Sequence, residues 1–529
     1  MIAQVLLLVA IPVAAALVTS LLGVRAREWA GLAVAAVLAG VVLAQANQAV
    51  TTDTIATARL PLPIGVEVGL IADGLALVML VMTALVGFGV AAFAWAEDRG
   101  DPGRHHRAFW PLVFSLWAAT NLLLLAGDLF TAYLMLEVVA LCGSLLVTLR
   151  GDRGSALAGT RYFYAELVAS TTMLLGIALV WSQAGTVVFA ELGPALDGEP
   201  LGRVGLAVMT IGLLLKAPLA PLHFWLPAAH TLAPSAVSPL LSGVMVKVAF
   251  AVLVRLWFLA VPDLVTEAAA QLIGAMGLLA ILWGSAGALL ATGLKRLIAS
   301  STVAQLGLLF LMVPVLAAGA VQGWTGGLVL AVSHALAKAA MLMAATVMVD
   351  SARRAGVPAP EAGSVAEVAD AAVGPAARAE GSAHGAAPAA SAVPVTVRGE
   401  TTWPLLHELR GSAVRRPVAM MAFGIAGLSL VGLPPSGGFV AKWYLLEGSV
   451  RTGQWWWVAA LVVGTLLTVG YLMRFVRPAF APLPDSERPV PRRDARDLVA
   501  LVLATSTLLL GLVPGPLVAL AGLGGPSGG

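Results

Sequence analysis

Long apolar runs, separated by short polar segments, dominate the chain. Fourteen runs are about as long as the ~20 residues that an α-helix needs to cross the hydrocarbon core of a bilayer. None alternates between apolar and polar residues as the strands of a membrane barrel do. The runs are residues 3–22, 29–48, 70–96, 108–126, 128–149, 161–184, 203–232, 236–260, 268–292, 298–318, 324–350, 417–447, 455–476 and 497–520. The pattern predicts an all-α polytopic membrane protein with about 14 transmembrane helices.

Two of these runs contain a helix break. The seventh reads KAPLAPLHFWLP, with Pro218 and Pro221, and the twelfth reads GLPPSGG, with Pro434 and Pro435. Proline lacks the backbone N–H and interrupts a helix. Inside a membrane, such a break is tolerated only where it is buried in protein or lines a wet cavity. The breaks lie five spans apart, which predicts two five-helix repeats, spans 4–8 and 9–13. They are inverted because each contains an odd number of spans.

These repeats suggest a division of the chain. We expect N-terminal helices 1–3 in residues 1–107, a first repeat in 108–260, a second in 261–350 and 404–480, and a last helix with its tail in 481–529. Residues 351–403 are rich in Ala, Pro, Gly and Ser and show no apolar periodicity. Such a segment buries too little surface to offset its ordering entropy, so we expect a flexible cytoplasmic linker. Docking of a partner is the alternative.

Composition narrows the class of protein. The 529 residues are 59% hydrophobic, with only 11% charged, against about 25% charged in soluble domains. A soluble globular protein is therefore excluded. The single cysteine, Cys142, excludes a disulfide framework, a cysteine-ligated iron–sulfur cluster and a multi-cysteine zinc site. The sequence has no phosphate-binding loop and no dinucleotide fingerprint. We expect no cofactor and no metal, and hence no catalysis by this chain alone.

The distribution of basic residues predicts the orientation. One set of alternate loops carries 22 of the 31 Lys and Arg residues, and the opposite set carries 3. Because basic loops stay in the cytoplasm, both termini are expected outside the cell (inner) membrane. The first span follows no basic residue and has no cleavage site with a polar mature domain after it, so we expect a retained helix.

The lysines of this chain occur mainly inside apolar spans, where charged residues are rare. The chain has five lysines and 26 arginines, yet four lysines lie inside apolar spans. Burying each costs about 2.5–3.5 kcal/mol. Arginine stays protonated almost anywhere, whereas a desolvated lysine can release its proton near neutral pH. A row of buried lysines can therefore relay protons.

Three candidates lie in the first half of the chain. Glu137 is near the middle of span five, Lys216 precedes the first break, and Lys247 is about eleven residues from both ends of its span. Neutralisation by a neighbour is the alternative for Glu137, and snorkelling to the interface is the alternative for the lysines.

Three more candidates follow in the second half. His334 and Lys338 are four residues apart and share a helix face. A satisfied core histidine is the alternative there. Lys442 follows the second break, with snorkelling outward as its alternative.

The other charged or titratable residues in or near the spans have structural interpretations, and two histidines also have a functional one. His223 and His230, beyond the first break, could extend a proton path to the cytoplasm, or could be interface histidines. Asp73, Arg255 and Arg474 lie near span ends and are expected to anchor at the interface. Glu166, one turn inside its predicted span, is expected to pair locally.

Four motifs resemble a known family. LLLKAPLAPLHFWLPAAHTLAPSAVSPLLSGVMVKVAF, LKRLIASSTVAQLGLLFL, SHALAKAAML and GLSLVGLPPSGGFVAKW resemble the antiporter-like subunits of respiratory complex I, Mrp-type Na+/H+ antiporters and membrane-bound hydrogenases. The resemblance covers spans 3–13. It implies a glutamate–lysine pair of Glu137 and Lys216 and a bridging Lys247. It also implies a central relay of His334 with Lys338, and a terminal Lys442 facing outward. Gln305 stands where many relatives have a titratable histidine.

The resemblance also ranks the functions. Lys442, the HxxxK pair and the short tail make the chain most similar to the D-type Mrp subunit. The leading expectation is therefore a proton-translocating subunit of a multi-subunit Na+/H+ antiporter, with other membrane subunits and the lipid bilayer as partners and no nucleic acid. The alternatives are a pump subunit of an NADH:quinone oxidoreductase or hydrogenase, and a subunit of an ion-coupled inorganic-carbon uptake complex.

Overall fold

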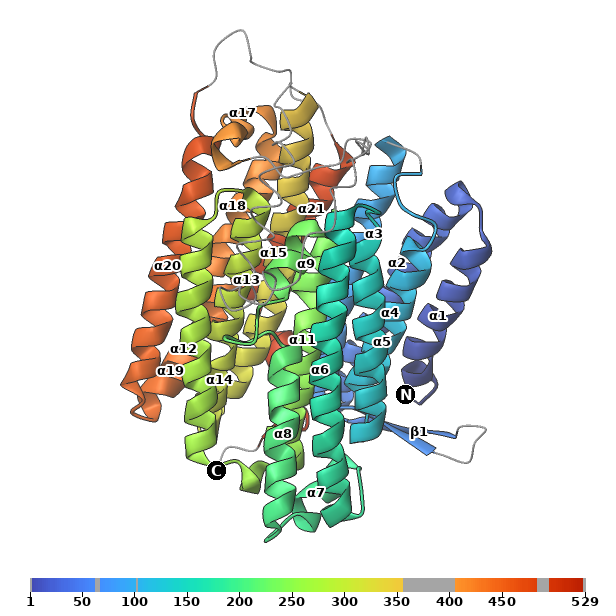
Figure 1. Cartoon of the computed structure of the whole chain (residues 1–529), viewed down its shortest axis with the longest axis vertical. Helices are drawn as coiled ribbons and strands as arrows, with labels where there is room; N and C mark the ends of the chain where they lie inside the picture. The colour runs from blue at the N-terminus through green and yellow to red at the C-terminus, as the bar shows by residue number, and fades with distance from the viewer. Residues whose placement is uncertain (1, 62–66, 101–102, 355–404, 483–493, 527–529) are drawn as a thin grey trace, which may run out of the picture.

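The structure is a bundle of long, roughly parallel helices (Figure 1). This computed structural model describes residues 2–61, 67–100, 103–354, 405–482 and 494–526. Figure 1 shows α13 and α15 in the middle of the bundle, α20 at one side, and α1 and α2 at the other. Within the described residues, ten helices are long and apolar enough to cross a membrane, and three shorter apolar helices accompany them. The all-α membrane fold expected from the sequence is confirmed.

Each predicted span corresponds to one helix or to a helix in pieces. The N-terminal helices are α1 (Ile2–Leu21), α2 (Val24–Thr52) and α3 (Gly74–Gly100). The first repeat contains α4 (Phe109–Leu125), α5 (Leu129–Thr148), α6 (Arg153–Ala184), α8 (Pro200–Lys216) with α9 (Leu226–Leu232), and α10 (Val237–Leu240) with α11 (Val246–Arg255). Short π-helical turns, η1 (Leu241–Met245) and η2 (Leu256–Ala260), flank α11. The short helix α7 (Phe189–Ala195) connects α6 to α8.

The second repeat has the same order of elements. It contains α12 (Glu267–Leu290), α13 (Leu294–Phe310) with α14 (Met312–Ala317), α15 (Gln322–Arg354), α18 (Pro417–Val431) with α19 (Gly437–Arg451), and α20 (Trp455–Ala479). The short helix α17 (Ser412–Arg415) precedes α18, and α21 (Ala495–Leu512) with α22 (Gly515–Gly522) completes the bundle. The exact repeat boundaries stay a prediction. α15 continues to Arg354, and residues 355–403 of the predicted linker lie outside the described residues.

Both predicted breaks are present. α8 ends at Lys216 and helix resumes at Leu226, while α18 ends at Val431 and helix resumes at Gly437. Gly432 ends α18 in the left-handed conformation, at φ 83°, which suits a residue without a side chain. The Ser436 hydroxyl then caps α19 by accepting a hydrogen bond from the Phe439 N–H at 3.3 Å. Gly432 and Ser436 therefore determine where the helix stops and where it starts again at the second break.

Two details differ from the sequence expectation. A two-stranded antiparallel hairpin, β1 (Ala56–Pro61) and β2 (Glu67–Ala72), precedes α3 where the third span was expected to start at residue 70. The sixth helix starts at Arg153, eight residues before the expected start, because Asp152 accepts a hydrogen bond from the Ser155 N–H at 2.7 Å and caps it. This first stretch of the helix is polar, so the apolar pattern of the sequence alone does not reveal its two extra turns.

Small residues let neighbouring helices approach closely. A Cβ atom on Gly307 of α13 would lie 2.3 Å from the Gly277 carbonyl oxygen of α12, and one on Gly176 of α6 would lie 2.6 Å from the Gly205 carbonyl oxygen of α8. In a bilayer, where hydrophobic exclusion does not drive helix association, such close backbone packing stabilises helix pairs. Each of the two repeats thus contains a helix pair held at close range by glycines.

A buried ion pair joins the start of α3 to the end of α11. Arg255 donates to both carboxylate oxygens of Asp73, at 2.6 and 2.9 Å, and to the Leu124 carbonyl at 3.2 Å. Both residues are only 6% exposed. The expectation that Asp73 and Arg255 anchor at the interface is wrong, because each finds its counter-charge inside the protein. Arg474 is exposed.

Replacing Asp73 by Ala should destabilise the protein by about 3–5 kcal/mol, because it leaves the Arg255 guanidinium buried without its counter-charge. The measurement is unfolding of the detergent-solubilised protein, followed by tryptophan fluorescence. Glu447→Ala is the matched control. It breaks a 2.8 Å pair with the exposed Arg451, which is worth about 0.5 kcal/mol or less. Equal effects of the two substitutions would contradict this account.

Candidate functional site

Lys216, at the C-terminal end of α8, lies between two carboxylates. Its Nζ is 2.9 Å from Glu166 Oε2 on α6 and 3.4 Å from Glu137 Oε1 on α5. Ser170, one turn beyond Glu166, donates a hydrogen bond to Glu137. The helix C-terminus also favours a cation there, since its free carbonyls carry partial negative charge. The structure thus brings the predicted pair Glu137 and Lys216 together and adds a third member.

Glu166 is the residue that the sequence interpretation undervalued. It was expected near a cytoplasmic helix end, but α6 starts at Arg153, so Glu166 lies thirteen residues inside the helix. Its side chain is 7% exposed, whereas that of Glu137 is 33% exposed. Glu166 is therefore the nearer and better-buried counter-charge of Lys216. The signal in the sequence was Asp152, a helix-capping residue fourteen positions before Glu166.

Lys247 has a backbone partner in place of a carboxylate. Its Nζ donates to the Ser242 carbonyl oxygen at 2.6 Å, and the residue is fully buried. Ser242 belongs to the π-helical turn η1, directly before α11. A π turn shifts the helical hydrogen-bond ladder and commonly marks functional sites. Snorkelling of Lys247 is excluded by this contact.

His334 and Lys338 lie one turn apart in α15, both buried. Lys338 Nζ donates to the Ile298 carbonyl at 3.0 Å and to the Ser301 hydroxyl. Neither ring nitrogen of His334 has a hydrogen-bond partner among the described residues. A satisfied core histidine is therefore the poorer interpretation of His334. Ser301 was not singled out from the sequence, although it stands in a polar SST run inside an apolar span.

Lys442 caps the broken end of α18. Its Nζ donates to the carbonyls of Leu430 at 3.0 Å and Val431 at 2.8 Å, and to the Thr465 hydroxyl at 3.2 Å. The helical donors for those carbonyls would come from Pro434 and Pro435, which have no N–H. The ammonium supplies the missing donors, so Lys442 points into the break and does not snorkel outward.

Both histidines after the first break are buried. His230 is 0% exposed, and its two ring nitrogens have no partner among the described residues. His223 is 9% exposed and meets the Trp283 ring edge-on at 5.9 Å. Three residues after His230, the Ala233 carbonyl accepts a hydrogen bond from Lys295. Lys295, assigned from the sequence to a basic loop, is 1% exposed, so all five lysines are buried.

The helices that carry these groups pack against one another in sequence. α8 contacts α11, η1 contacts α15, and α15 contacts α13 and α19. The buried groups therefore lie on helices that are successive neighbours in the bundle: the Lys216 cluster, Lys247, the His334–Lys338 pair, and Lys442.

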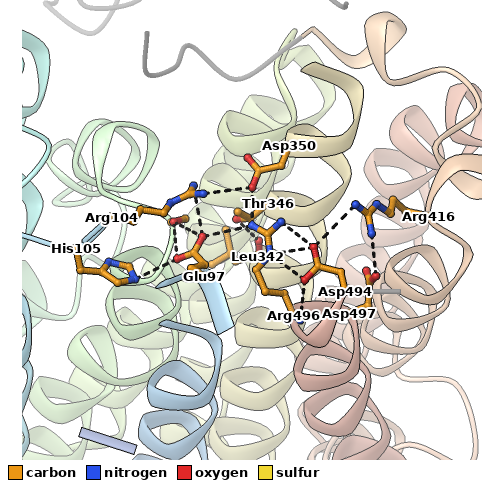
Figure 2. A network of polar contacts seen from close by, with 11 residues as sticks. Glu97, Arg104, His105, Leu342, Thr346, Asp350, Arg416, Asp494, Arg496 and Asp497 are labelled. Carbon is orange, nitrogen blue, oxygen red and sulfur yellow. Dashed lines mark hydrogen bonds and ion pairs between the residues drawn. The ribbon is translucent and has the colours of Figure 1, made fainter. Parts of the chain in front are cut away.

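A separate ionic network joins helix ends on the side of the basic loops, as Figure 2 shows. Glu97, at the end of α3, lies 3.5 Å from both Arg104 and His105 and 3.7 Å from Arg496 of α21. Arg496 also contacts Asp350 of α15 at 2.5 Å. Sequence inspection did not reveal this network, because its members come from four distant segments.

The network continues to α18 and shifts the pKa values of its loop members. Arg496 contacts Asp494 at 2.8 Å, and Arg416 contacts Asp497 at 3.3 Å. Burial lowers the pKa of His105 to about 4, so its ring is neutral at pH 7. Burial raises the pKa of Asp494, but hydrogen bonds and charge from Arg496 outweigh it and hold the pKa below its usual value. The network thus links the ends of α3, α15, α18 and α21 to one another.

Among the described residues, no group of three or more His, Cys, Asp or Glu side chains is placed to hold a metal ion. The arrangement consists of side chains that can exchange protons and of backbone oxygens that accept hydrogen bonds.

Sequence comparison identifies relatives of the chain. The family model described as "NADH:quinone oxidoreductase/Mrp antiporter, TM" matches residues 126–356 and 394–468. NADH-quinone oxidoreductase subunit N of Desulforudis audaxviator is 32% identical over 475 residues, which cover 85% of this chain and 83% of that protein.

Structural comparison finds the same fold in two respiratory or antiporter assemblies. A chain of the Mrp complex from Dietzia sp. DQ12-45-1b matches with a TM-score of 0.78 at 24% identity, covering 99% of this chain and 97% of that one. A chain of the membrane-bound sulfane sulfur reductase, an archaeal respiratory membrane complex, matches with a TM-score of 0.80 at 22% identity, covering 98% and 96%. At these identities the likeness shows the fold alone.

The geometry at Lys216 predicts unequal coupling to its two carboxylates. A double-mutant cycle between Lys216→Ala and Glu166→Gln should give an interaction energy of about 1–3 kcal/mol. The cycle with Glu137→Gln should give less than about 1 kcal/mol, since that carboxylate is farther away and partly exposed. Unfolding of the detergent-solubilised protein provides the energies. Stronger coupling to Glu137 than to Glu166 would contradict the observed geometry.

Proposed function

Since this chain belongs to the membrane-subunit family shared by NADH:quinone oxidoreductases and Mrp antiporters, we propose that it is a proton-translocating subunit of a redox-driven, multi-subunit complex of the NADH:quinone oxidoreductase type. The observation that carries this choice is the 32% identity to an NADH-quinone oxidoreductase subunit N across most of both chains.

This choice reverses the ranking from the sequence motifs, which favoured a D-type Mrp subunit. Lys442, the HxxxK pair and the short tail are compatible with either class. The Mrp antiporter is the second candidate, supported by a TM-score of 0.78 over 99% of the chain. That likeness concerns the fold, which the sulfane sulfur reductase chain shares equally.

The proposed mechanism begins at Lys216. Glu166 and Glu137 stabilise its charged form, so the proton is held while the three groups are together. When a conformational change separates them, the charge loses its counter-ions and the proton moves on to Lys247, to the His334–Lys338 pair and then to Lys442. Packed helices lie about 8–10 Å apart, beyond the ~3 Å reach of a hydrogen bond. Water or hydroxyl groups must therefore complete each step.

The proposed orientation places the basic loops in the cytoplasm. It is supported by the 22:3 division of basic residues between the two sets of alternate loops. On this arrangement His223 and His230 belong to the side from which protons are taken up.

A neighbouring membrane subunit is proposed at the α5 face. Glu137 is one-third exposed although it lies near the middle of α5. A carboxylate facing lipid at that depth would be costly, and a protein neighbour removes that cost. Membrane subunits of the same type of assembly are the proposed partners.

Purification of the tagged chain in a mild detergent tests the class of complex. We expect soluble flavin and iron–sulfur subunits to copurify, and reconstituted vesicles to move protons when NADH and a quinone are added. Recovery of hydrophobic subunits alone, with Na+/H+ exchange that needs no electron donor, would instead establish the antiporter.

Lys216→Ala should reduce proton movement in those vesicles by about 100-fold or more, within the range attributed to a positioned proton-transfer group, while the complex remains assembled. Lys216→Arg is the matched variant: it keeps the positive charge but cannot release a proton, so it should fail equally. A pH-sensitive dye reports the transport. Retained transport in both variants would rule out the relay.

A further inference from the structure

A polar bridge spans the space between Lys338 and Lys442. These two lysines lie on α15 and α19 and do not share a hydrogen-bond partner. Of the helices packed against them, α13 contributes a buried glutamine, and α20 contributes a buried tyrosine and two threonines.

Gln305 of α13 is the centre of this bridge and is 1% exposed. Its amide Nε2 donates to Thr468 Oγ1 at 3.1 Å and to Tyr471 Oη at 3.2 Å, both on α20. Nε2 also lies 3.5 Å from the Leu430 carbonyl oxygen. The side chain thus joins α13 to two other helices.

The hydroxyl groups continue toward Lys442. Tyr471 donates to Thr468 Oγ1 at 3.2 Å. Thr465 lies one turn before Thr468 on the same face of α20, and its hydroxyl accepts from Lys442 Nζ at 3.2 Å. The Thr468 hydroxyl itself donates to the Gly464 carbonyl at 2.7 Å. Lys442 also donates to the Leu430 carbonyl, which lies 3.5 Å from Gln305 Nε2. The bridge therefore comes within one helical turn of Thr465, the hydroxyl partner of Lys442.

The opposite end faces Lys338. Ser301, which accepts a hydrogen bond from Lys338, lies four residues before Gln305 and hence on the same face of α13. Gln305 Oε1 is buried and has no donor among the described residues. A buried amide oxygen is costly to leave unpaired, and a water molecule held there between Ser301 and Gln305 would supply the donor.

We propose that Gln305, Tyr471 and Thr468 form the bridge over which protons pass between Lys338 and Lys442. This inference rests on the proposed function and deepens it. Gln305 is a positioning residue: its amide does not titrate, and it orients water at Oε1 and the hydroxyls at Nε2. Sequence inspection marked Gln305 only as the loss of a titratable histidine.

The proton balance requires no further reactant. Lys338 releases a proton to water at Gln305 Oε1, and that water passes one of its own protons to Tyr471 Oη. Tyr471 then releases its original proton along its hydrogen bond to Thr468. Thr468 Oγ1 donates to the Gly464 carbonyl in this structure, so its hydroxyl must rotate away from that carbonyl to release a proton toward Thr465. Lys442 gains the last proton, so every intermediate group ends in its initial state.

A purely structural role is the rival, because the same hydrogen bonds also brace α13 against α20. The two roles differ in what a missing hydroxyl does. A brace affects stability and assembly, whereas a relay affects the rate of proton transfer and its sensitivity to D2O.

The test uses the intact complex in vesicles, with proton movement measured in H2O and in D2O. Tyr471→Phe and Thr468→Val should each reduce proton movement about tenfold or more and change the D2O effect, with subunit composition preserved. Thr468→Ser retains the hydroxyl and should restore transport. Tyr444→Phe is the matched control, since it removes a hydroxyl on α19 outside the bridge, and it should behave as the unmodified complex does.

Lys442→Ala, measured in parallel, distinguishes a failure of the bridge from a failure of the proposed function. If Lys442→Ala abolishes transport while Tyr471→Phe and Thr468→Val transport normally, the bridge is wrong and the relay stands. If Lys442→Ala also transports normally, the proposed function itself fails. If Tyr471→Phe does not assemble, the Thr468→Val and Thr468→Ser pair decides: equal rates in these two variants would overturn the bridge.

Discussion

The need to satisfy buried ammonium groups shapes the interior of this protein. All five lysines are buried, and each donates to an oxygen that helix geometry or a neighbouring helix provides. The irregular segments supply many of these oxygens. The π turn before Lys247 presents the Ser242 carbonyl, and the proline break before Lys442 leaves two carbonyls without helical donors. Departures from regular helix at membrane depth are thus the places where cations are accommodated.

The buried lysines differ in the kind of partner that they have. Among the described residues, Lys216 has two carboxylate partners, whereas the hydrogen bonds of Lys247, Lys338 and Lys442 go to carbonyl and hydroxyl oxygens. Lys216 is therefore the one of these four lysines with formal counter-charges, and the proposed mechanism places its controlled first step, the separation of an ion pair, at this residue.

The fold alone does not separate the two candidate classes of complex, because chains of an Mrp complex and of a sulfane sulfur reductase superimpose about equally well on this one. The proposed relay of buried lysines suits either class. In that proposal, the partly exposed Glu137 beside Lys216 is the place where a partner subunit acts on the ion pair.

Much of this organisation followed from the sequence alone. Apolar length set the number of spans, paired prolines located both breaks, and the cost of burying charge identified Glu137, Lys216, Lys247, Lys338 and Lys442, because these signals are local along the chain. Partner choice is not local. Glu166, Ser301 and Tyr471 became visible only when α6, α13 and α20 packed against the lysine-bearing helices, since an isolated Glu, Ser or Tyr in an apolar run carries no record of what faces it. The ionic network around Glu97 and the burial of Lys295 have the same origin. The sequence therefore determined where charge enters the membrane, and only tertiary packing decided what compensates it.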